Sequence, residues 1–312
     1  MSPRVIHTAQ ALVDAVVEVP ALPRRGGNVM ATSYRRYAGG AVTVLLAAAR
    51  SGAAAVHAGA VGTGPNGDLV REVLAADGVT LSAPPVTEAD TGVCVVLVEP
   101  GAERTFVTTQ GAERAVTAAG FATSRPEPGD QVCVSGYSLV GATRDPLLEW
   151  LASLPAGVGV VLDPGATFAE VPDEVRDAVL ARTSVWTGNA EESAALAGVD
   201  GAPEAAAVLA GLLPDGAVVL VRDGPRGCLV REDGRTTTLP GHPRRPVDTN
   251  GAGDTHTGVL LAGRLAGLSW ADAAVRANAA AAITVTRRGP DTAPGSAEVD
   301  EFLAALGPRP AG

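Results

Sequence analysis

Lysine is absent from this chain of 312 residues, so all 24 of its basic residues are arginine. A Walker-type phosphate loop requires a lysine, and its absence excludes that kind of nucleotide site. The formal net charge of −10 disfavours a nucleic-acid or anionic-membrane surface, because a phosphate backbone needs a basic face. Aromatic residues make up only 3% of the chain, so the core must consist mostly of Ala, Val and Leu.

Cysteine is also scarce. Cys94, Cys133 and Cys228 lie far apart, each in an apolar stretch, and no C-x-x-C spacing occurs. We therefore expect buried, reduced thiols and no cysteine-held metal. No apolar run is long enough for a membrane span, and Asp14 and Glu18 interrupt the first apolar stretch, which is atypical of a signal peptide. The expectation is a cytoplasmic protein that contacts neither membrane nor nucleic acid.

Short β-branched runs alternate with longer Ala/Leu-rich amphipathic ones along most of the chain. The predicted strand–helix pairs are AAVHAGAVG with GDLVREVLAADG, QVCVSGY with RDPLLEWLASL, VGVVLDPG with PDEVRDAVLARTS, and SVWTGN with AEESAALAG. A further strand, AVVLVRDG, precedes two helical stretches that begin at TNGAGD and SWADAA. Such alternation predicts an α/β fold whose mostly parallel sheet is covered on both faces.

Two regions, 11–37 and 91–110, are strand-like and lack intervening helices. The second predicts a hairpin around the turn EPGAE. Because a few strands are marginal alone, we expect a small sheet that forms a lid over the carboxyl edge of the main sheet. No long linker appears, so residues 1–312 are interpreted as one domain, with only the tail GPRPAG expected to be disordered.

The stretch GTGPNG, residues 62–67, satisfies the G-x-G-x-x-G pattern between a strand and a helix. A lone fingerprint is weak evidence for a dinucleotide site, and Pro65 removes one amide donor from the turn. A tight strand–helix turn explains the glycines equally well, and it is the interpretation we favour.

The stretch PVDTNGAGDTHTG contains a second Gly-rich turn. Gly251, Ala252 and Gly253 precede Asp254 at the start of a predicted helix. Successive amides and the helix dipole would favour a phosphate there. Asp254 also fits a simple helix cap, worth about 1 kcal/mol, and the pattern alone does not decide between them.

Two further junctions carry polar residues. Asn189 and Glu192, in TGNAEESAALAG, either order a hydrated Mg²⁺ near phosphate or simply begin a helix. Gly39 and Gly40 open an apolar helix downstream of Asp14, an aspartate in an otherwise apolar strand. Asp14 needs a partner there, which would be solvent or the hydroxyls of a polyhydroxylated ligand.

The order of these motifs along the whole chain resembles the ribokinase-like (PfkB) carbohydrate kinase family. DTNGAGDTHTG is similar to the family's C-terminal signature and GNAEE to its N-x-x-E motif. The resemblance implies a three-layer α/β/α fold with a β-sheet lid, and a kinase that uses ATP and Mg²⁺ with K⁺ as a possible third cofactor. It also reassigns GTGPNG to the family's N-terminal Gly-rich turn.

The resemblance further implies a role for each matching residue. Asp254 would be the general base that deprotonates the acceptor hydroxyl, and the amides of Gly251, Ala252 and Gly253 would form the anion hole. The remaining assignments are Asn189 and Glu192 for phosphate and water-bound Mg²⁺, Asp248 for a monovalent cation, Arg222, Gly224, Gly227 and Asn278 for the nucleotide, and Asp14, Gly39 and Gly40 for sugar hydroxyls.

The chain departs from the family where the sugar is bound. The family usually has Asn after the Gly-Gly pair, and Thr43 matches it here after a one-residue shift. The lysine that ribokinases often carry beside the glycines is also missing. We expect ATP-dependent phosphorylation of a sugar hydroxymethyl group. The alternatives are a nucleoside kinase whose pocket Thr43 and Arg104 shape, a catalytically silent binding protein and an NAD-dependent oxidoreductase. Exposed lid strands predict a homodimer.

Overall fold

The computed structural model describes residues 2–101 and 103–307. Within these residues a nine-stranded central sheet forms the middle of the molecule. Side by side, its strands are β13 (Arg235–Pro240), β12 (Gly227–Glu232), β11 (Val218–Arg222), β10 (Val185–Asn189), β9 (Gly159–Asp163), β8 (Gln131–Ser135), β1 (Arg4–His7), β4 (Ala54–His57) and β5 (Thr80–Leu81). All neighbours pair in parallel except β11 with β12 and β12 with β13, so the predicted mostly parallel sheet is confirmed.

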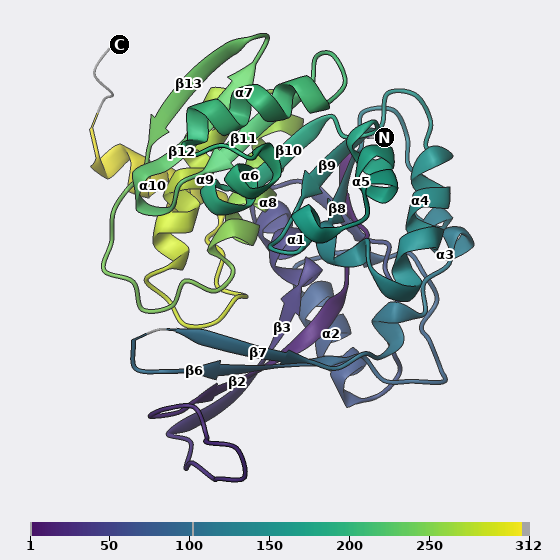
Figure 1. Cartoon of the computed structure of the whole chain (residues 1–312), viewed down its shortest axis with the longest axis vertical. Coiled ribbons are helices and arrows are strands. Elements are labelled where there is room, and N and C mark those ends of the chain that lie inside the picture. Colours follow the sequence, from purple (N-terminus) through teal and green to yellow (C-terminus); the bar gives the residue numbers. More distant parts are fainter. Residues whose placement is uncertain (1, 102, 308–312) are drawn as a thin grey trace.

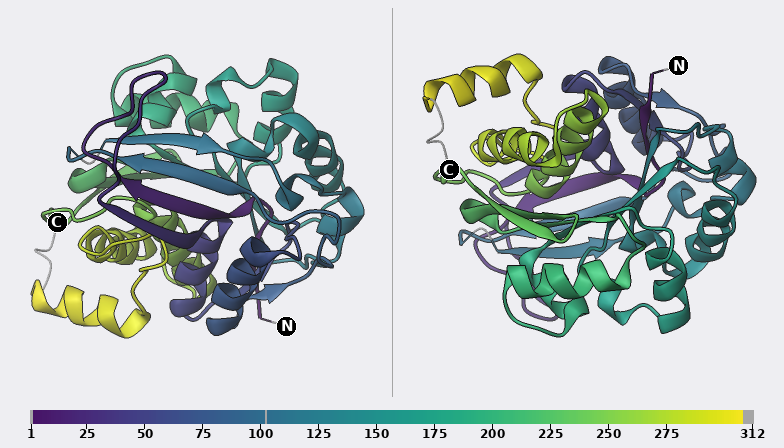
Figure 2. Two further views of the ribbon diagram at one scale, coloured as in Figure 1. Left: turned by 90° about the horizontal axis from the view of Figure 1, so that it is seen from below. Right: turned by 90° about the horizontal axis from the view of Figure 1, so that it is seen from above.

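Helices cover both faces of this sheet (Figure 2). One layer contains α1 (Ala41–Arg50), α2 (Pro65–Ala76), α8 (Ala252–Leu265), α9 (Trp270–Thr284) and α10 (Ser296–Ala305). The other contains α3 (Ala118–Ala122), α4 (Arg144–Ala152), α5 (Asp173–Leu180), α6 (Ala190–Ala197) and α7 (Ala202–Leu212). The result is the three-layer α/β/α arrangement that alternating strand and helix patterns favour.

The core consists mainly of small aliphatic side chains, as the composition requires. Strand residues such as Val219 and Leu220 are fully buried, and the few aromatics fill the largest spaces. Phe168 packs edge-on against Trp186 with ring centroids 5.9 Å apart. The three cysteines are free and buried, as predicted. Burying each Val or Leu side chain contributes about 1.5–3 kcal/mol to the stability of the fold. This packing keeps the ends of the strands in fixed positions.

A second, four-stranded sheet lies across the carboxyl edge of the central one and extends beyond it (Figure 1). Its order is β3 (Ser33–Gly40), β2 (Ala11–Glu18), β6 (Val93–Val98) and β7 (Arg104–Thr108), and we call this sheet the lid. β6 and β7 form the predicted antiparallel hairpin, although its turn includes residue 102, which lies outside the described residues. The predicted disordered tail likewise lies almost wholly outside them, from residue 308 onward.

The sequence interpretation missed the hairpin formed by β12 and β13. Its turn residues Asp233 and Gly234 have φ angles of 48° and 74°. An Asp-Gly pair with two positive φ angles is typical of a tight two-residue hairpin, so the signal was present in REDGRTTT. Strands β1 and β5 were also missed, because four and two residues are too few for a clear pattern.

The turn Gly62–Gly67 leads the chain from β4 into α2, and its geometry does not favour a phosphate site. The Asp90 side chain accepts hydrogen bonds from the amides of Asn66 at 3.0 Å and Gly67 at 2.9 Å. A pyrophosphate would need these same N–H groups, and the Asp90 carboxylate already holds them. This contact agrees with the structural interpretation of GTGPNG.

No single helix in the described part of the chain is both long and apolar enough to span a membrane. Within the same described residues, α6 and α7 together reach that length and apolarity, but the pair is bent by 56°.

Candidate active site

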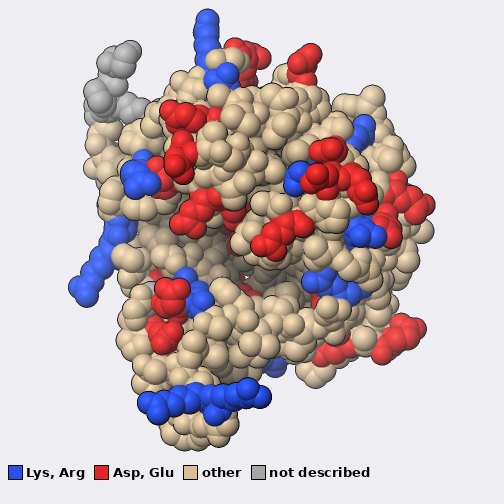
Figure 3. Space-filling model, viewed as in Figure 1, with Lys and Arg blue, Asp and Glu red and all other residues tan. Residues whose placement is uncertain are grey.

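A cavity of about 450 Å³ lies between the lid and the carboxyl edge of the central sheet. Figure 3 shows the molecule hollowed between these two parts. The lid contributes Leu12, Asp14, Cys94, Phe106 and Thr108, because alternate residues of a strand face the same side. The opposite wall includes Ser135, Tyr137, Asp163, Asn250, Asp254 and Thr257. Open α/β sheets bind ligands at this edge, so the cavity is the candidate active site.

Asp254 lies in the first turn of α8 and lines the cavity. Burial raises its pKa to about 7, and the neighbouring charge of Asp163 adds to this while Arg222 opposes it. A carboxylate with a pKa near neutrality can both accept a proton and release it under physiological conditions. Asp254 therefore has the environment of a general base, beyond that of a helix cap.

The turn before Asp254 leaves backbone donors free. Gly251 has a φ of 74°, and its carbonyl accepts from Thr255 N at 2.8 Å. The amide of Ala252 lies 3.4 Å from Thr249 O, whereas those of Gly253 and Asp254 have no acceptor among the described residues. Two unpaired N–H groups at the start of a fourteen-residue helix suit an anion.

Arg222, at the end of β11, ties this turn to the sheet. It donates to Gly253 O at 2.9 Å and to Asp163 Oδ2 at 3.1 Å, and it lies 3.7 Å from Glu192 Oε2. A Cβ on Gly253 would stand 2.9 Å from Arg222 Nη1, so a larger residue here would push against the guanidinium. Arg222 is thus placed behind the predicted anion hole, where its positive charge also favours a bound phosphate.

Asp163 was missed by sequence reasoning although it lies at the end of β9 and lines the cavity. Its signal was weak: a single aspartate followed by Pro-Gly also fits an ordinary turn. Only the fold shows that strands β9, β10 and β11 end side by side and so bring Asp163, Asn189 and Arg222 to one edge.

Asn189 and Glu192 form a reciprocal capping box at the start of α6. Asn189 Oδ1 accepts from Glu192 N at 2.8 Å, and Glu192 Oε2 accepts from Asn189 N at 2.8 Å. The structural alternative for this motif is therefore present. Glu192 nevertheless keeps a second carboxylate oxygen, and burial together with Asp163 raises its pKa. Both the cap and a functional role remain compatible with the geometry.

The β2–β3 pair positions Asp14 at the lid wall of the cavity. A Cβ on Gly39 would overlap the Asp14 carboxylate, so glycine makes room for this side chain. Gly40 has a φ of 64° and turns the chain from β3 into α1. Asp14 accepts a hydrogen bond from Asn250 Nδ2 at 3.4 Å, and burial raises its pKa to about 6. Asn250, another residue not singled out before, joins the lid to the Gly-rich turn.

The structure corrects the assignment at Thr43. This side chain is 1% exposed, does not line the cavity and lies beneath the Gly-rich turn, with Cγ2 only 3.0 Å from where a Gly251 Cβ would stand. Val44 lines the cavity instead. Neighbouring residues of a helix point about 100° apart, so a shift of one position moves the side chain away from the ligand wall.

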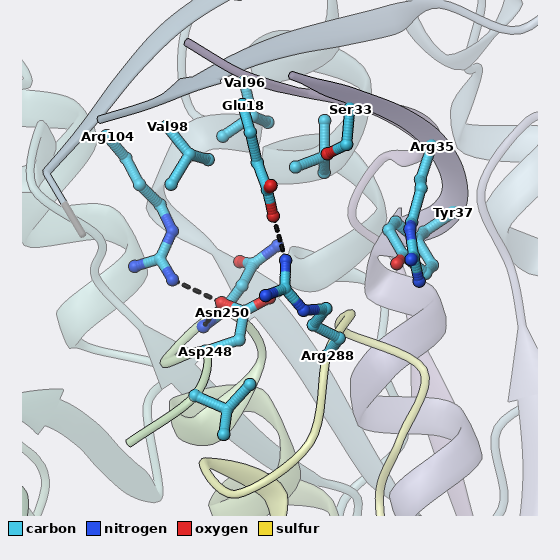
Figure 4. Close-up of a pocket in the computed structure, with 12 residues that line it drawn as sticks. Glu18, Ser33, Arg35, Tyr37, Val96, Val98, Arg104, Asp248, Asn250 and Arg288 are labelled. Carbon is cyan, nitrogen blue, oxygen red and sulfur yellow. Dashed lines mark hydrogen bonds and ion pairs between the residues drawn. The ribbon is translucent and has the colours of Figure 1, made fainter. Parts of the chain in front are cut away.

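Arg104 reaches from the lid to the loop before the Gly-rich turn (Figure 4). Its guanidinium forms an ion pair with Asp248 and donates to Thr249 Oγ1 at 2.7 Å. Asp248 also accepts from Asn250 N at 2.9 Å and Gly289 N at 3.1 Å. Arg104 and Asp248 line a separate small cavity of about 50 Å³, and Arg104 does not line the larger one.

The predicted nucleotide residues Gly224, Gly227 and Asn278 do not line the large cavity. Gly224 and Gly227 flank the turn between β11 and β12 with φ angles of 54° and 107°. Asn278, on α9, is buried and fully used by the protein: it donates to Leu239 O at 3.3 Å and Pro240 O at 3.2 Å, and pairs with His256 at 3.1 Å. Asn278 therefore positions the end of β13 rather than presenting its own amide.

No group of three or more His, Cys, Asp or Glu side chains in the described ranges could hold a metal ion unaided. This is compatible with Mg²⁺, which usually binds through one or two carboxylates, waters and substrate phosphates. Glu192 and Asp163 are acidic, lie at one edge of the sheet and face Arg222. These residues fit a hydrated Mg²⁺ brought with a nucleotide.

The model of the pfkB family carbohydrate kinases matches residues 4–296. This chain belongs to that family, and it is an ATP-binding sugar kinase with the ribokinase-like fold. The family and the class of reaction expected from the motif order are thereby confirmed.

Two curated relatives cover nearly the whole chain. The uncharacterized sugar kinase YegV of Escherichia coli is 31% identical over 93% of this chain and 91% of its own. The ATP-dependent ribose-1-phosphate kinase of Halopiger xanaduensis is 30% identical over 96% and 98%.

Solved structures share the fold. Arabidopsis thaliana ribokinase complexed with ribose and ATP superposes with a TM-score of 0.81 at 23% identity, covering 97% of this chain and 99% of its own. A putative ribokinase II of Escherichia coli in complex with ATP and Mg²⁺ gives 0.83 at 23% identity with the same coverage.

Proposed function

We propose that this protein transfers the terminal phosphoryl group of ATP to a hydroxyl, preferably a hydroxymethyl, of a sugar or sugar-like acceptor. Asp254 is the general base, and the amides of Gly251, Ala252 and Gly253 form the anion hole for the transferring group. Asp14 with Gly39 and Gly40 binds acceptor hydroxyls. Phosphoryl transfer depends mainly on positioning and on neutralising charge, which these groups supply.

One observation carries the proposal. A half-buried carboxylate with a raised pKa, Asp254, lies beside the unpaired helix-start amides of Gly253 and of Asp254 itself, and it faces the same cavity as Asp14. A base beside an anion site contributes about 10²–10⁴-fold to a proton-coupled transfer. A silent binding protein would have no need for a cavity carboxylate whose charge its surroundings disfavour.

In this proposal ATP and Mg²⁺ are bound by Asn189, Glu192, Arg222 and the glycines of the β11–β12 turn. Mg²⁺, when bound with ATP, neutralises phosphate charge, and Glu192 with Asp163 would hold its waters. Asp248 remains the candidate for a monovalent cation. Because Arg104 already pairs with Asp248, we expect at most a modest stimulation by K⁺ over Na⁺.

The direct test follows ADP release with ATP, Mg²⁺ and a panel of sugars, sugar derivatives and nucleosides. Turnover of a sugar supports the proposal, whereas turnover of nucleosides alone would replace it by nucleoside kinase activity. Asp254→Asn should abolish transfer while ATP binding, measured by calorimetry, stays within about threefold. No turnover with any acceptor would leave only the binding role.

We also propose that the lid mediates a homodimer. β3 and β7 are the outer lid strands, and Tyr34 and Val107 on them are exposed by 61% and 59%. Unpaired strand edges with apolar side chains favour association with a second copy. Sedimentation should show a dimer that Val107→Glu weakens; a monomer at all concentrations contradicts this.

A further inference from the structure

Negatively charged side chains outnumber positively charged ones in the lining of the large cavity. Its lining includes the carboxylates of Asp14, Asp163 and Asp254, and a single cationic side chain among the described residues, Arg114. His7 also lines it but stays neutral, because burial lowers its pKa to about 3. Asp163 is already paired with Arg222. Among the described residues that line this cavity, Arg114 is therefore the one positive group that an acceptor can meet.

Arg114 has no strong partner within the protein. Its Nη1 lies 3.4 Å from the carbonyl oxygen of Tyr137 and 3.5 Å from Thr143 Oγ1, at the limit of hydrogen bonding. Its Nε is buried without an acceptor. No carboxylate lies within ion-pair distance of it in the part of the chain that the structure describes.

The neighbouring carboxylate, Glu113, is held by backbone donors and forms no ion pair with Arg114. The carboxylate of Glu113 accepts from Gly92 N at 2.7 Å and Gly111 N at 2.8 Å, and this anchors the short 3₁₀ helix Ala112–Arg114. Glu113 thus fixes the segment that holds Arg114 at the cavity. The small lid cavity differs, since its Arg104 and Arg288 are paired with Asp248 and Glu18 (Figure 4).

A partly buried guanidinium without a counter-charge is costly unless a ligand supplies one. Its planar fork matches the oxygens of a carboxylate or phosphate, and such pairs are strong and directional. A neutral sugar would satisfy Asp14 and Asp254 through hydroxyls but would leave the charge of Arg114 unpaired.

We propose that the acceptor carries an anionic oxygen group, the carboxylate of a sugar acid or the phosphate of a sugar phosphate, and that Arg114 binds this group. The proposal rests on the kinase activity proposed above and specifies its substrate class. Arg114 holds one end of the acceptor while Asp14 and Asp254 receive its hydroxyls. The three acidic side chains of the cavity reject anions elsewhere, so Arg114 also sets the orientation.

The test compares matched neutral and anionic acceptors with the full chain, ATP and Mg²⁺. The neutral set is ribose, fructose and glucose; the anionic set is gluconate, glucuronate, ribose 1-phosphate and fructose 6-phosphate. We expect kcat/KM to be at least about tenfold higher for an anionic acceptor, and the two kinds of anion distinguish carboxylate from phosphate. A hydrogen bond to a charged group of about 1.5–3 kcal/mol corresponds to this range.

Variants locate the effect. Arg114→Gln should raise KM for the anionic acceptor about tenfold or more and remove the preference for anionic over neutral acceptors, while Arg114→Lys should restore part of the loss. Calorimetric titration of gluconate and ribose 1-phosphate measures the same binding without turnover. If Arg114→Gln does not fold, the wild-type preference for anions tests the acceptor class, and Arg114→Lys tests the residue.

The two proposals fail separately. Turnover of neutral sugars with no anion preference, or an anion preference unaltered in Arg114→Gln, overturns the role of Arg114 and leaves the kinase. Arg114-dependent binding of an anionic probe without any phosphorylation overturns the proposed transfer and supports the site. If no probe is either phosphorylated or bound, the anionic-acceptor proposal is overturned.

Discussion

At the scale of single residues, Asp254 determines how the reaction should depend on pH. Burial and the charge of Asp163 raise its pKa to about 7, and only the ionised form can accept the acceptor's proton. We therefore expect kcat/KM to be constant above about pH 8 and to fall toward tenfold per unit below pH 7. Initial rates between pH 5.5 and 9 measure this. A flat profile between pH 6 and 8 would remove Asp254 from the role of base.

Gly39 offers a second residue-scale prediction. A methyl group there would overlap the Asp14 carboxylate and displace it from the cavity wall. Gly39→Ala should raise KM for the acceptor by about tenfold or more while KM for ATP stays within twofold, since a lost charge-assisted hydrogen bond costs about 1.5–3 kcal/mol. Gly211→Ala is the control, because nothing lies within 4 Å of a Cβ on this α7 residue. Equal acceptor kinetics in both variants would show that Asp14 does not bind the acceptor.

At the scale of elements, the β6–β7 hairpin is joined to the loop before the Gly-rich turn. Arg104 connects β7 to Asp248 and Thr249, and Asp248 fixes the amides of Asn250 and Gly289 (Figure 4). The lid and the anion-hole turn are therefore mechanically connected, so that the position of one constrains the other.

Removing this connection should slow transfer. Arg104→Gln leaves the half-buried Asp248 without its ion pair, and truncating one partner of such a pair costs about 2–5 kcal/mol. We expect kcat to fall at least tenfold with acceptor at saturation. Arg288→Gln is the matched control, because its pair with Glu18 is more exposed and exposed pairs contribute about 0–1 kcal/mol. Similar losses in both variants would indicate a general weakening of the lid.

At the scale of the whole molecule, features contained in one short stretch of sequence could be predicted, whereas contacts between distant segments could not. Strand–helix alternation, the hairpin in 91–110 and the Gly-rich turn before Asp254 are each contained in one short stretch. The pair of Arg222 with Asp163, 59 residues apart, exists only because β9 and β11 end at one edge. Arg114 likewise belongs to no recognisable sequence motif. Its proposed role can be inferred only from the cavity, which segments far apart in the sequence form. The sequence pattern predicted Thr43 at the cavity wall, whereas Val44 lines it. The pattern was therefore too coarse to place a helix residue to within one position.

Whole-molecule stability should depend on pH through two opposing sets of buried groups. Burial lowers the pKa of His7, His57 and His256 to about 3, 4 and 3. Each of them stabilises the fold above pH 6.5, and that stabilisation is lost as the pH falls toward 4. Burial raises the pKa of Asp14 and Asp254 to about 6 and 7, so their cost to the fold appears as the pH rises from 3.8 through those values.

Single substitutions should separate the two sets. Asp254→Asn removes a charge that the fold holds at a cost, so its Tm should exceed that of the wild type by a few °C at pH 8, with the difference vanishing near pH 4. His57→Leu removes a fully buried imidazole whose pKa burial lowers to about 4, so its loss of Tm between pH 6.5 and 4.5 should be shallower than that of the wild type. Thermal unfolding of the three proteins from pH 4.5 to 8 measures both slopes. If Asp254→Asn is less stable than the wild type at pH 8, the carboxylate is held by favourable contacts, and the electrostatic account of its raised pKa is wrong.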